Sequence, residues 1–171
     1  MKYLIITLLF FTQVYASLDS INSFEADFTQ SVTDEKNKVL VYSGHVIASK
    51  PQKAVWNYIK PIEKNVYINA YSVVIVEPEI EQVIVKRIKS NFDFFNMIKN
   101  AKRIKENTYE ASYKNTIFTI ISKNSLIQSV LYKDEFDNNI KIIFKKQIQN
   151  KDIDDKKFIP DIPMEYDVIR D

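Results

Sequence analysis

The sequence predicts a mainly β protein, in which an antiparallel sheet curls or closes into a barrel and one central helix accompanies it. Three observations lead to this prediction. Apolar and polar residues alternate in many short segments, which is the pattern of half-buried strands. These segments recur at roughly 8–12-residue spacing with polar turns between them, as in β-sandwiches and barrels. Only one interior segment carries a clear helical stripe of apolar residues.

The first residues have the three regions of a secretory signal peptide. Lys2 precedes an apolar run at residues 3–11, and Val14 and Ala16 fit the minus-three and minus-one positions of a cleavage site. The run is too short to span a membrane as a helix, which takes roughly 20 apolar residues. A buried N-terminal strand or helix is the alternative. The sequence therefore predicts a cleaved signal peptide over residues 1–16.

The remaining residues, 17–171, are predicted to form one exported domain, because they contain no linker, low-complexity tract or internal repeat. They contain no cysteine, so we expect neither disulfides nor a thioether lipid anchor. A single glycine, Gly44, excludes glycine-rich phosphate loops, and a single histidine without cysteine excludes the usual zinc sites. Loss of Lys2 with the signal peptide leaves the charge nearly balanced, which argues against a nucleic-acid-binding surface.

The elements follow one another in a regular order. Outside the hairpin described next, strands are predicted at residues 24–32, 39–48, 65–69, 72–76, 81–88, 108–113, 116–122, 126–132 and 140–149. Short helical turns are predicted at residues 17–22 and 152–157. The C-terminal tail, residues 158–169, is expected to be extended because prolines interrupt it.

The segment 44–61 predicts a hairpin with an apolar, partly aromatic face. Its strands are joined at residues 50–53, and Pro51 and Pro61 fit strand ends because proline has no amide hydrogen to donate. Since strand side chains alternate, one face consists of Val46, Ala48, Ala54, Trp56 and Tyr58. Lys50 places one cation at the rim of this face.

The interior helix is predicted over residues 91–101. Its apolar stripe consists of Phe94, Phe95, Ile98 and Ala101. Asn91 is the candidate N-cap, and Asp93 is expected in the first turn, where a negative charge is favourable. The cations Lys99, Lys102 and Arg103 suit the C-terminal end of the helix.

Three sets of titratable residues are candidate functional groups, and each has a simpler explanation. His45 is the only histidine, but alternation places it on the outward face and no serine motif accompanies it. An acidic cluster, which could bind Ca²⁺ but is explained by a solvated turn, consists of Glu77, Glu79 and Glu81. A basic set, which could attract phosphate or an anionic membrane but is explained by a solvated face, consists of Lys86, Arg87, Lys89, Lys99, Lys102, Arg103 and Lys105. None of these sets predicts an enzyme.

Aromatic residues supply a large apolar area from the strands and from the helix. They are Phe24, Phe28, Trp56, Tyr58, Phe94 and Phe95. An ordinary packed core explains such residues. A barrel with a helix over one open end could instead enclose an apolar ligand. Sequence periodicity does not distinguish the two arrangements.

Several segments, in the same order along the chain, form a recognisable pattern. They are FEADFTQSV, GHVIASKPQKAVWNYIKP, the EP-x-x-EQ motif, the Phe-rich helix and the C-terminal FIP and YDVI. The matching positions are Phe24, Ala26, Phe28, Gln30, Gly44, Lys50, Pro51, Trp56 and Pro61. This pattern resembles the LolA-type periplasmic carriers of outer-membrane lipoproteins. The resemblance covers essentially the whole chain after the signal peptide.

The resemblance implies an incomplete antiparallel β-barrel covered by a helical lid, with an apolar space between them that takes the acyl chains of a lipoprotein. It also implies receipt of the lipoprotein from an inner-membrane ABC transporter complex and delivery to an outer-membrane receptor or to the outer membrane itself. An exposed acyl chain costs about 0.8 kcal/mol per CH₂, so transport through water requires such a container. We therefore expect a periplasmic monomer with no catalytic activity, no cofactor and no nucleic-acid partner.

By position, the resemblance implies a lipid-binding cavity lined by Val46, Ala48, Trp56, Tyr58, Val66 and Ile68 from the sheet and by Phe94, Phe95, Met97 and Ile98 from the helix. Lys50 stands where the family usually has an arginine that bonds carbonyls of the lid loop and holds the lid shut. Because lysine lacks the planar fork of arginine, we expect looser closure. At residues 69–74 the Asp-Gly turn of the family is missing, which changes the expected turn geometry. Ala54, small where the family has a bulkier residue, is expected to widen the cavity mouth.

Two other functions stay open at this point. An exported barrel of this kind could bind a different amphiphile, such as a glycolipid or a free lipid. An exported hydrolase that uses His45 is the third hypothesis.

Overall fold

The computed structural model describes residues 18–88 and 93–170, so the signal peptide predicted at residues 1–16 lies outside the described range. The strands are β1 (Ser23–Thr33), β2 (Val39–Ser49), β3 (Lys53–Lys60), β4 (Lys64–Ile68), β5 (Ser72–Glu77), β6 (Gln82–Arg87), β7 (Lys102–Lys105), β8 (Thr108–Tyr113), β9 (Thr116–Lys123), β10 (Leu126–Lys133), β11 (Asn139–Gln149) and β12 (Asp167–Arg170). The helices are α1 (Phe94–Lys99) and three short 3₁₀ turns, η1 (Leu18–Ser20), η2 (Pro78–Ile80) and η3 (Asp155–Phe158). All of the predicted strands are present, with ends that differ by one or two residues.

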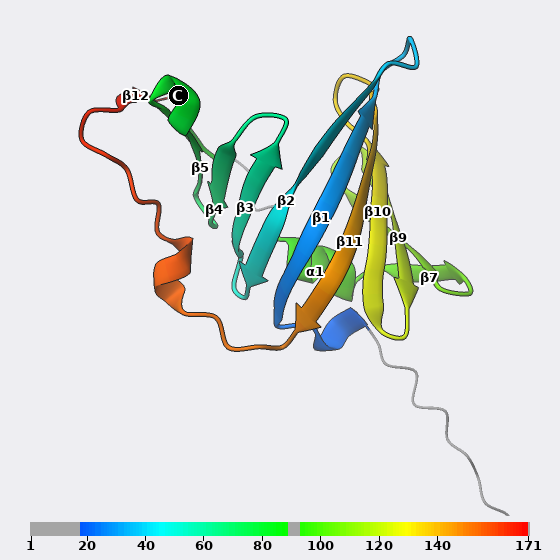
Figure 1. Ribbon diagram of the computed structural model, residues 1–171. Coiled ribbons are helices and arrows are strands. Elements are labelled where there is room, and N and C mark those ends of the chain that lie inside the picture. The colour runs from blue at the N-terminus through cyan, green and yellow to red at the C-terminus, as the bar shows by residue number, and fades with distance from the viewer. Residues whose placement is uncertain (1–17, 89–92, 171) are drawn as a thin grey trace, which may run out of the picture.

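The twelve strands form one sheet in the order β12-β6-β5-β4-β3-β2-β1-β11-β10-β9-β8-β7. The sheet curls around helix α1, which lies behind β1–β3 in Figure 1. Its two end strands, β12 and β7, do not pair with each other, so the barrel is incomplete. This arrangement confirms the predicted fold class, an unclosed barrel with a helix over its concave side.

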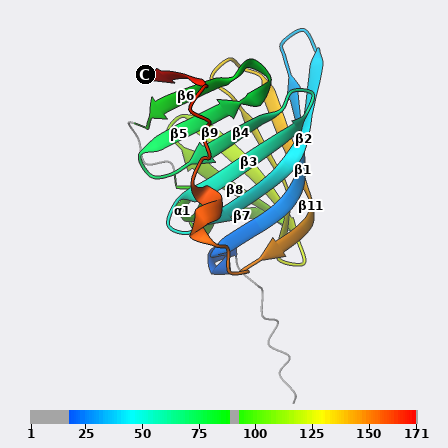
Figure 2. The ribbon, with the colours of Figure 1, turned by 60° about the vertical axis from the view of Figure 1, so that its left-hand side comes forward.

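One edge of the sheet differs from the antiparallel prediction. Strand β12 pairs with β6 in parallel, with Val168 opposite Val83 and Ile169 opposite Ile84. Residues 150–166, which connect β11 to β12, bring the chain to this edge of the sheet. This segment, which we call the C-terminal strap, leaves β11 and runs across the outside of the sheet to β6 (Figure 2). The sequence predicted only an extended tail here.

Helix α1 is shorter than the predicted helix at residues 91–101. It begins after Asp93, whose Oδ1 accepts a hydrogen bond from the Asn96 backbone N–H at 3.0 Å. Asp93 is therefore the N-cap and not a first-turn residue, and the N-cap predicted at Asn91 lies outside the described residues. Lys102 and Arg103 were expected to end the helix, but they form strand β7, because pairing with β8 satisfies their backbone groups.

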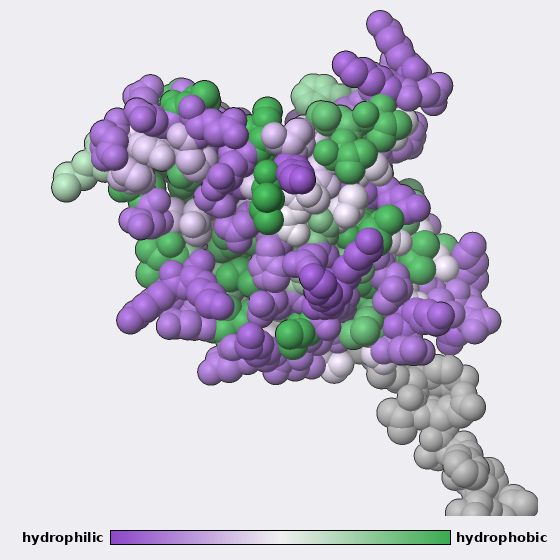
Figure 3. Space-filling view, in the orientation of Figure 1, coloured by the Kyte–Doolittle hydropathy of each residue, from purple (hydrophilic) through white to green (hydrophobic). Residues whose placement is uncertain are grey.

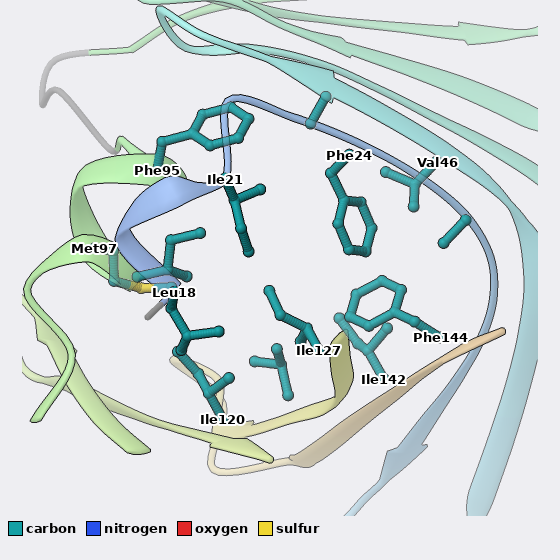
Figure 4. Close-up of a cluster of buried hydrophobic side chains, with 14 of the residues drawn as sticks. Leu18, Ile21, Phe24, Val46, Phe95, Met97, Ile120, Ile127, Ile142 and Phe144 are labelled. Carbon is teal, nitrogen blue, oxygen red and sulfur yellow. The ribbon is translucent and has the colours of Figure 1, made fainter. Parts of the chain in front are cut away.

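The main core lies between the concave face of the sheet and a layer made of η1 and α1. Figure 4 shows Leu18 and Ile21 pointing into the space between the α1 residues Phe95 and Met97 and the side chains of the sheet. The most deeply buried core residues include Ile98, Ile120 and Ile127. The N-terminal turn thus fills the space under the helix.

A second, smaller cluster lies on the convex face, under the C-terminal strap. Ile153 of the strap packs on Ile47 of β2 and Val55 of β3, with Tyr67 and Phe158 beside them. Elsewhere on the face shown in Figure 3, hydrophilic residues predominate and apolar residues gather in separate patches. The strap therefore covers an apolar part of the convex face.

Gly44 allows β2 and β3 to approach closely in the middle of the sheet. A Cβ atom at this position would lie 1.9 Å from the Asn57 backbone oxygen and 3.0 Å from the Phe28 ring. The pairing of β2 with β3 shifts register between Ser43 and Gly44, which brings the Asn57 carbonyl over this residue. Any side chain would force the two strands apart, which explains why this position is a glycine.

Candidate apolar binding site

An apolar pocket lies between the concave face of strands β1–β4 and β11 and helix α1. It is lined by Phe24, Val46, Ala48, Gln52, Lys53, Ala54, Trp56, Ile68, Phe94, Phe95 and Phe144. Its free volume is about 80 Å³. Since one water molecule needs about 10–15 Å³ of such volume, this space holds several water molecules and is far smaller than a long acyl chain. In this form the helix covers the site, and a large apolar ligand requires the helix to move.

The apolar surface of the pocket continues along the concave face toward β6. Trp56 lies opposite Val66, Val66 opposite Ile75, and Ile75 opposite Ile84. Directly opposite residues of antiparallel strands share a face, so these four side chains form one row. The neighbouring row on the same strands contains Ile68 and, opposite it, Val73. We use the name open wall for the half-buried residues of the two rows, which are Val66, Ile68, Val73, Ile75 and Ile84.

Helix α1 presents an apolar face to the sheet and to η1. Phe95, Met97 and Ile98 are buried, whereas Phe94 is half-buried at the side of the pocket. The ring centroids of Phe94 and Phe95 lie 5.7 Å apart in an edge-to-face arrangement. The helix has six residues, and isolated helices of this length are unstable in water, so its position depends on these contacts.

Lys50, in the turn between β2 and β3, connects three parts of the chain near this helix. Its Nζ donates a hydrogen bond to Asn22 Oδ1 at 3.0 Å and lies 6.0 Å from the centroid of the Phe95 ring. Its backbone N–H donates to the Asn22 carbonyl at 2.9 Å. The resemblance implied a bond from Lys50 to lid-loop carbonyls. Within the described residues the ammonium meets the N-terminal segment and an aromatic ring of the helix instead.

A chain of aromatic rings extends from the pocket along the concave face. Phe144 contacts Phe24 and Trp56, and Phe28 contacts Trp56 and Tyr58, with centroids 4.9–6.3 Å apart. Three of these contacts are edge-to-face and that of Trp56 with Phe144 is tilted, and aromatic pairs of this kind add about 0.5–1.5 kcal/mol each beyond the burial of area. The rings therefore give the pocket a rigid floor.

A polar group ends this chain of rings. The Tyr58 hydroxyl donates to Gln30 Oε1 at 2.9 Å, and burial raises the pKa of Tyr58 to about 12. Lys64 Nζ lies 4.7 Å from the Tyr58 ring centroid and 5.3 Å from that of Tyr42. Gln30 interrupts the apolar alternation of β1, and its partnership with Tyr58 explains why a polar residue stands there.

The structure brings six of the ten predicted lining residues together around the pocket, namely Val46, Ala48, Trp56, Ile68, Phe94 and Phe95. Tyr58 lies farther along the chain of rings, and Val66 lies on the open wall. Met97 and Ile98 are buried in the core under the helix and do not line this pocket.

The pocket is also lined by residues that the prediction omitted, namely Phe24, Gln52, Lys53 and Phe144. Phe24 and Phe144 are neighbours because β1 pairs with β11, a contact between distant parts of the sequence. Alternation in each strand gives the inward direction of these rings, but nothing in the sequence indicates that the two strands are adjacent. Gln52, at the end of the turn before β3, and Lys53, the first residue of β3, also line the pocket, as does Ala54.

The other candidate groups lie away from the pocket. His45 lies on the convex face, where Nδ1 is 3.0 Å from Asp27 Oδ1 and Nε2 is 3.4 Å from Glu25 Oε1. The hydrogen bond from His45, followed by that from Lys146, lowers the pKa of the Asp27 carboxyl. This network joins β1 to β2 and β11.

The acidic and basic sets are also dispersed. Glu77, Glu79 and Glu81 belong to the turn around η2, and the described residues contain no group of side chains suited to a metal ion. The described basic residues are divided among β6, α1 and β7. Among the helices of the described residues, none is long and apolar enough to cross a membrane.

Comparison with known proteins gives a consistent result. The profile of the family described as outer membrane lipoprotein carrier protein LolA matches residues 19–108. An outer-membrane lipoprotein carrier protein from Campylobacter jejuni is 38% identical over 99% of this chain and 99% of its own length. Its counterpart from Wolinella succinogenes is 34% identical over 91% of each chain.

Solved structures share the fold at low sequence identity. A protein from Thermus thermophilus gives a TM-score of 0.55 at 11% identity, over 90% of this chain and 93% of that chain. A LolA superfamily protein from Nitrosomonas europaea gives a TM-score of 0.52 at 8% identity, over 82% of this chain and 91% of that chain.

Proposed function

The chain belongs to the LolA family of outer membrane lipoprotein carrier proteins, and we propose on this basis that it is a periplasmic chaperone for lipoproteins. It binds the acyl chains of lipoproteins that leave the inner membrane and carries them to the outer membrane. The observation that carries this proposal is the apolar pocket under α1, which continues into the open wall of the sheet. Residues 17–171 act as the single carrier domain after removal of residues 1–16.

The pocket binds acyl chains when helix α1 moves away from the sheet. In this proposal the ten residues predicted from the family contact the lipid, and Met97 and Ile98 do so only after this movement. Lys50 favours the closed form through Asn22 and the Phe95 ring. Closure is loose because a six-residue helix and one lysine hold it.

The donor is an inner-membrane ABC transporter complex, and the acceptor is an outer-membrane receptor or the outer membrane itself. An acyl chain gains about 0.8 kcal/mol for each CH₂ that it buries, so capture needs no chemical step. We propose accordingly that the protein is a carrier without catalytic activity. His45 has structural partners on the convex face, which supports a role outside hydrolysis.

The proposal is tested by incubating spheroplasts with buffer or with purified residues 17–171. We expect a triacylated lipoprotein to appear in the soluble fraction as a one-to-one complex. Phe94→Ser should reduce its yield, because this half-buried residue lines the pocket and its loss leaves the buried core in place. Phe136→Ser is the matched control, since Phe136 is 72% exposed in the turn between β10 and β11.

Two outcomes would contradict the proposal. Lipoproteins could stay in the membrane while a small lipid copurifies with the protein, which would indicate a carrier of another amphiphile. Phe94→Ser and Phe136→Ser could also behave alike, which would place the lipid outside the pocket.

A further inference from the structure

The chain of aromatic rings has an apolar end near helix α1 and a polar end farther along strand β3. The inward residues of β3, counted from the turn at residues 50–52, are Ala54, Trp56 and Tyr58, and the first two line the pocket. Tyr58 lies about 13 Å from Ala54 along the strand, since each of the four residues adds about 3.3 Å. It therefore stands beyond the pocket, on the side away from the turn.

Tyr58 and Gln30 form a hydrogen-bonded pair on either side of strand β2. Gly44 lies opposite both Phe28 and Tyr58, and because it has no side chain the two rings meet with their centroids 5.1 Å apart. The Tyr58 hydroxyl donates to Gln30 Oε1 at 2.9 Å. Burial raises the pKa of Tyr58 to about 12, so the hydroxyl lies in surroundings poor in water.

Two further residues make this end of the concave face polar. Lys64 lies directly opposite Tyr58, and its ammonium is 4.7 Å from the Tyr58 ring centroid and 5.3 Å from that of Tyr42. Tyr42 lies directly opposite Gln30. We call these four residues of β1–β4 the polar corner. An apolar chain gains nothing by entering it, because breaking the hydrogen bond leaves partly buried polar groups unpaired.

A ligand that enters at the α1 end meets the polar corner last. The helix covers the pocket in this form, so the ligand enters where the helix moves away. The headgroup of an acylated ligand then stays near α1, and its tail runs past Trp56 and Phe28 toward Tyr58. These rings contact one another, and the surface that they offer is apolar up to the Tyr58 hydroxyl.

We propose that the Tyr58–Gln30 pair ends the acyl-binding surface and limits the length of the acyl chain that the protein accommodates. This inference rests on the proposed function, since it assumes that acyl chains enter the pocket from the α1 end. Each CH₂ buried before the tail reaches the pair raises the affinity about fourfold, which corresponds to about 0.8 kcal/mol. Further CH₂ groups break the hydrogen bond or remain in water, so they add no affinity. Tyr58 and Gln30 are then specificity-determining residues.

The test measures how the affinity depends on chain length for a headgroup of no net charge. Monomeric lysophosphatidylcholines with saturated chains from decanoyl to icosanoyl are titrated into residues 17–171. Trp56, the single tryptophan of the chain, reports binding by its fluorescence. We expect the affinity to rise about fourfold per CH₂ and then to level off within the series. In Gln30→Leu/Tyr58→Phe the rise should continue to longer chains, and the variant should stay folded because neither partner is left unpaired.

Asn57→Leu/Asn65→Leu is the matched control. These two residues also form a hydrogen-bonded pair between neighbouring strands, at 2.7 Å, but on the convex face. We expect this variant to level off at the same chain length as the unaltered protein.

Three results would overturn the inference. The unaltered protein could gain affinity over the whole series without levelling off. Gln30→Leu/Tyr58→Phe could level off at the same chain length as the unaltered protein. The same variant could also lose affinity equally at every length, because the headgroup and not the tail would then meet the pair. An absence of binding at every chain length would instead count against the proposed function.

Discussion

The two halves of the curled sheet differ in what covers their concave faces. In the half formed by β1 and β8–β11, many inward residues are buried in the core beneath η1 and α1, and Ile120 and Ile127 have no exposed surface. In the half formed by β3–β6, inward residues such as Ile75 and Ile84 remain half-buried. The first half has the core of an ordinary domain. The second keeps an apolar surface available, which a protein can do only if other contacts stabilise it.

Those other contacts lie on the convex side. The C-terminal strap packs Ile153 against Ile47 and Val55, and β12 adds a strand to the edge of β6. The open half is therefore supported from outside, so its inner surface stays free for a ligand. One half of the sheet therefore holds the buried core that stabilises the domain, and the other half holds the apolar surface that is available for binding.

The largest effect should follow from a change at the junction of the two halves. Gly44→Ala places a Cβ atom 1.9 Å from the Asn57 backbone oxygen, and a backbone atom cannot rotate away as a side chain can. We expect the free energy of unfolding to fall by more than about 3 kcal/mol, because β2 and β3 must separate. Chemical denaturation followed by circular dichroism measures this loss. Ser43→Ala, one residue earlier, should change the stability by less than about 0.5 kcal/mol.

The next prediction compares the halves directly by one substitution in each. Ile120→Ala removes a fully buried side chain and should lower the free energy of unfolding by about 2–4 kcal/mol. Ile75→Ala, in the open wall, should cost about 1 kcal/mol or less, because water already reaches this side chain. Ile75→Ala should instead weaken lipoprotein binding, which Ile120→Ala should leave intact at a temperature where it is folded. Equal losses of stability would refute the distinction between the halves.

Sequence alternation predicts most of the strands and their inward faces, but it does not predict the short edge strands or the end of the helix. Alternation located every long strand and gave the inward face of the hairpin, since Trp56 and Ala54 do lie on the concave side. The strands β7 and β12 were missed because they have four residues each and owe their structure to the neighbour that they pair with. The helix was placed correctly but made too long, because the apolar stripe includes Ala101, which packs on the core after the helix has ended.

The pocket could be predicted from the sequence only in part. The resemblance supplied six of its residues, of which three lie in the hairpin, two in the helix and one, Ile68, in the strand that follows the hairpin. Phe144 was not found, since its place beside Phe24 depends on the pairing of β1 with β11. The half-exposed state of the open wall could not be predicted either, because the same alternation fits a filled and an unfilled concave face.

A smaller effect is expected at the polar end of the chain of rings, where the filled and open halves meet. Tyr58→Phe leaves Gln30 without its hydrogen-bond donor, and we expect a loss of about 1 kcal/mol at neutral pH. The substitution should also change the response to alkali. Burial raises the pKa of Tyr58 from 10.0 to about 12, so between these values the folded protein keeps a proton that the unfolded chain has lost.

This contribution is fully present below pH 10 and is lost as the pH rises toward 12. The stability of the unaltered protein should therefore fall across this window, and Tyr58→Phe should reduce the slope. Part of the slope remains in the variant, because burial also raises the pKa of Tyr132 and Tyr67. Tyr71→Phe, at a residue that is 81% exposed, is the control and should leave the slope unchanged.

The smallest effect is expected where the C-terminal strap meets the open half through charge. Lys53 Nζ lies 2.7 Å from Asp155 Oδ1, but the Asp155 side chain is 75% exposed. Asp155→Asn should therefore lower the free energy of unfolding by less than about 1 kcal/mol at low salt, and the difference should vanish at high salt. Asp152→Asn, a nearby exposed acid of the strap, serves as the control in the same denaturation experiment. A loss of several kcal/mol for Asp155→Asn would mean that charge holds the strap in place. The support of the open half would then depend on ionic strength, and the apolar contacts of Ile153 would not be its main cause.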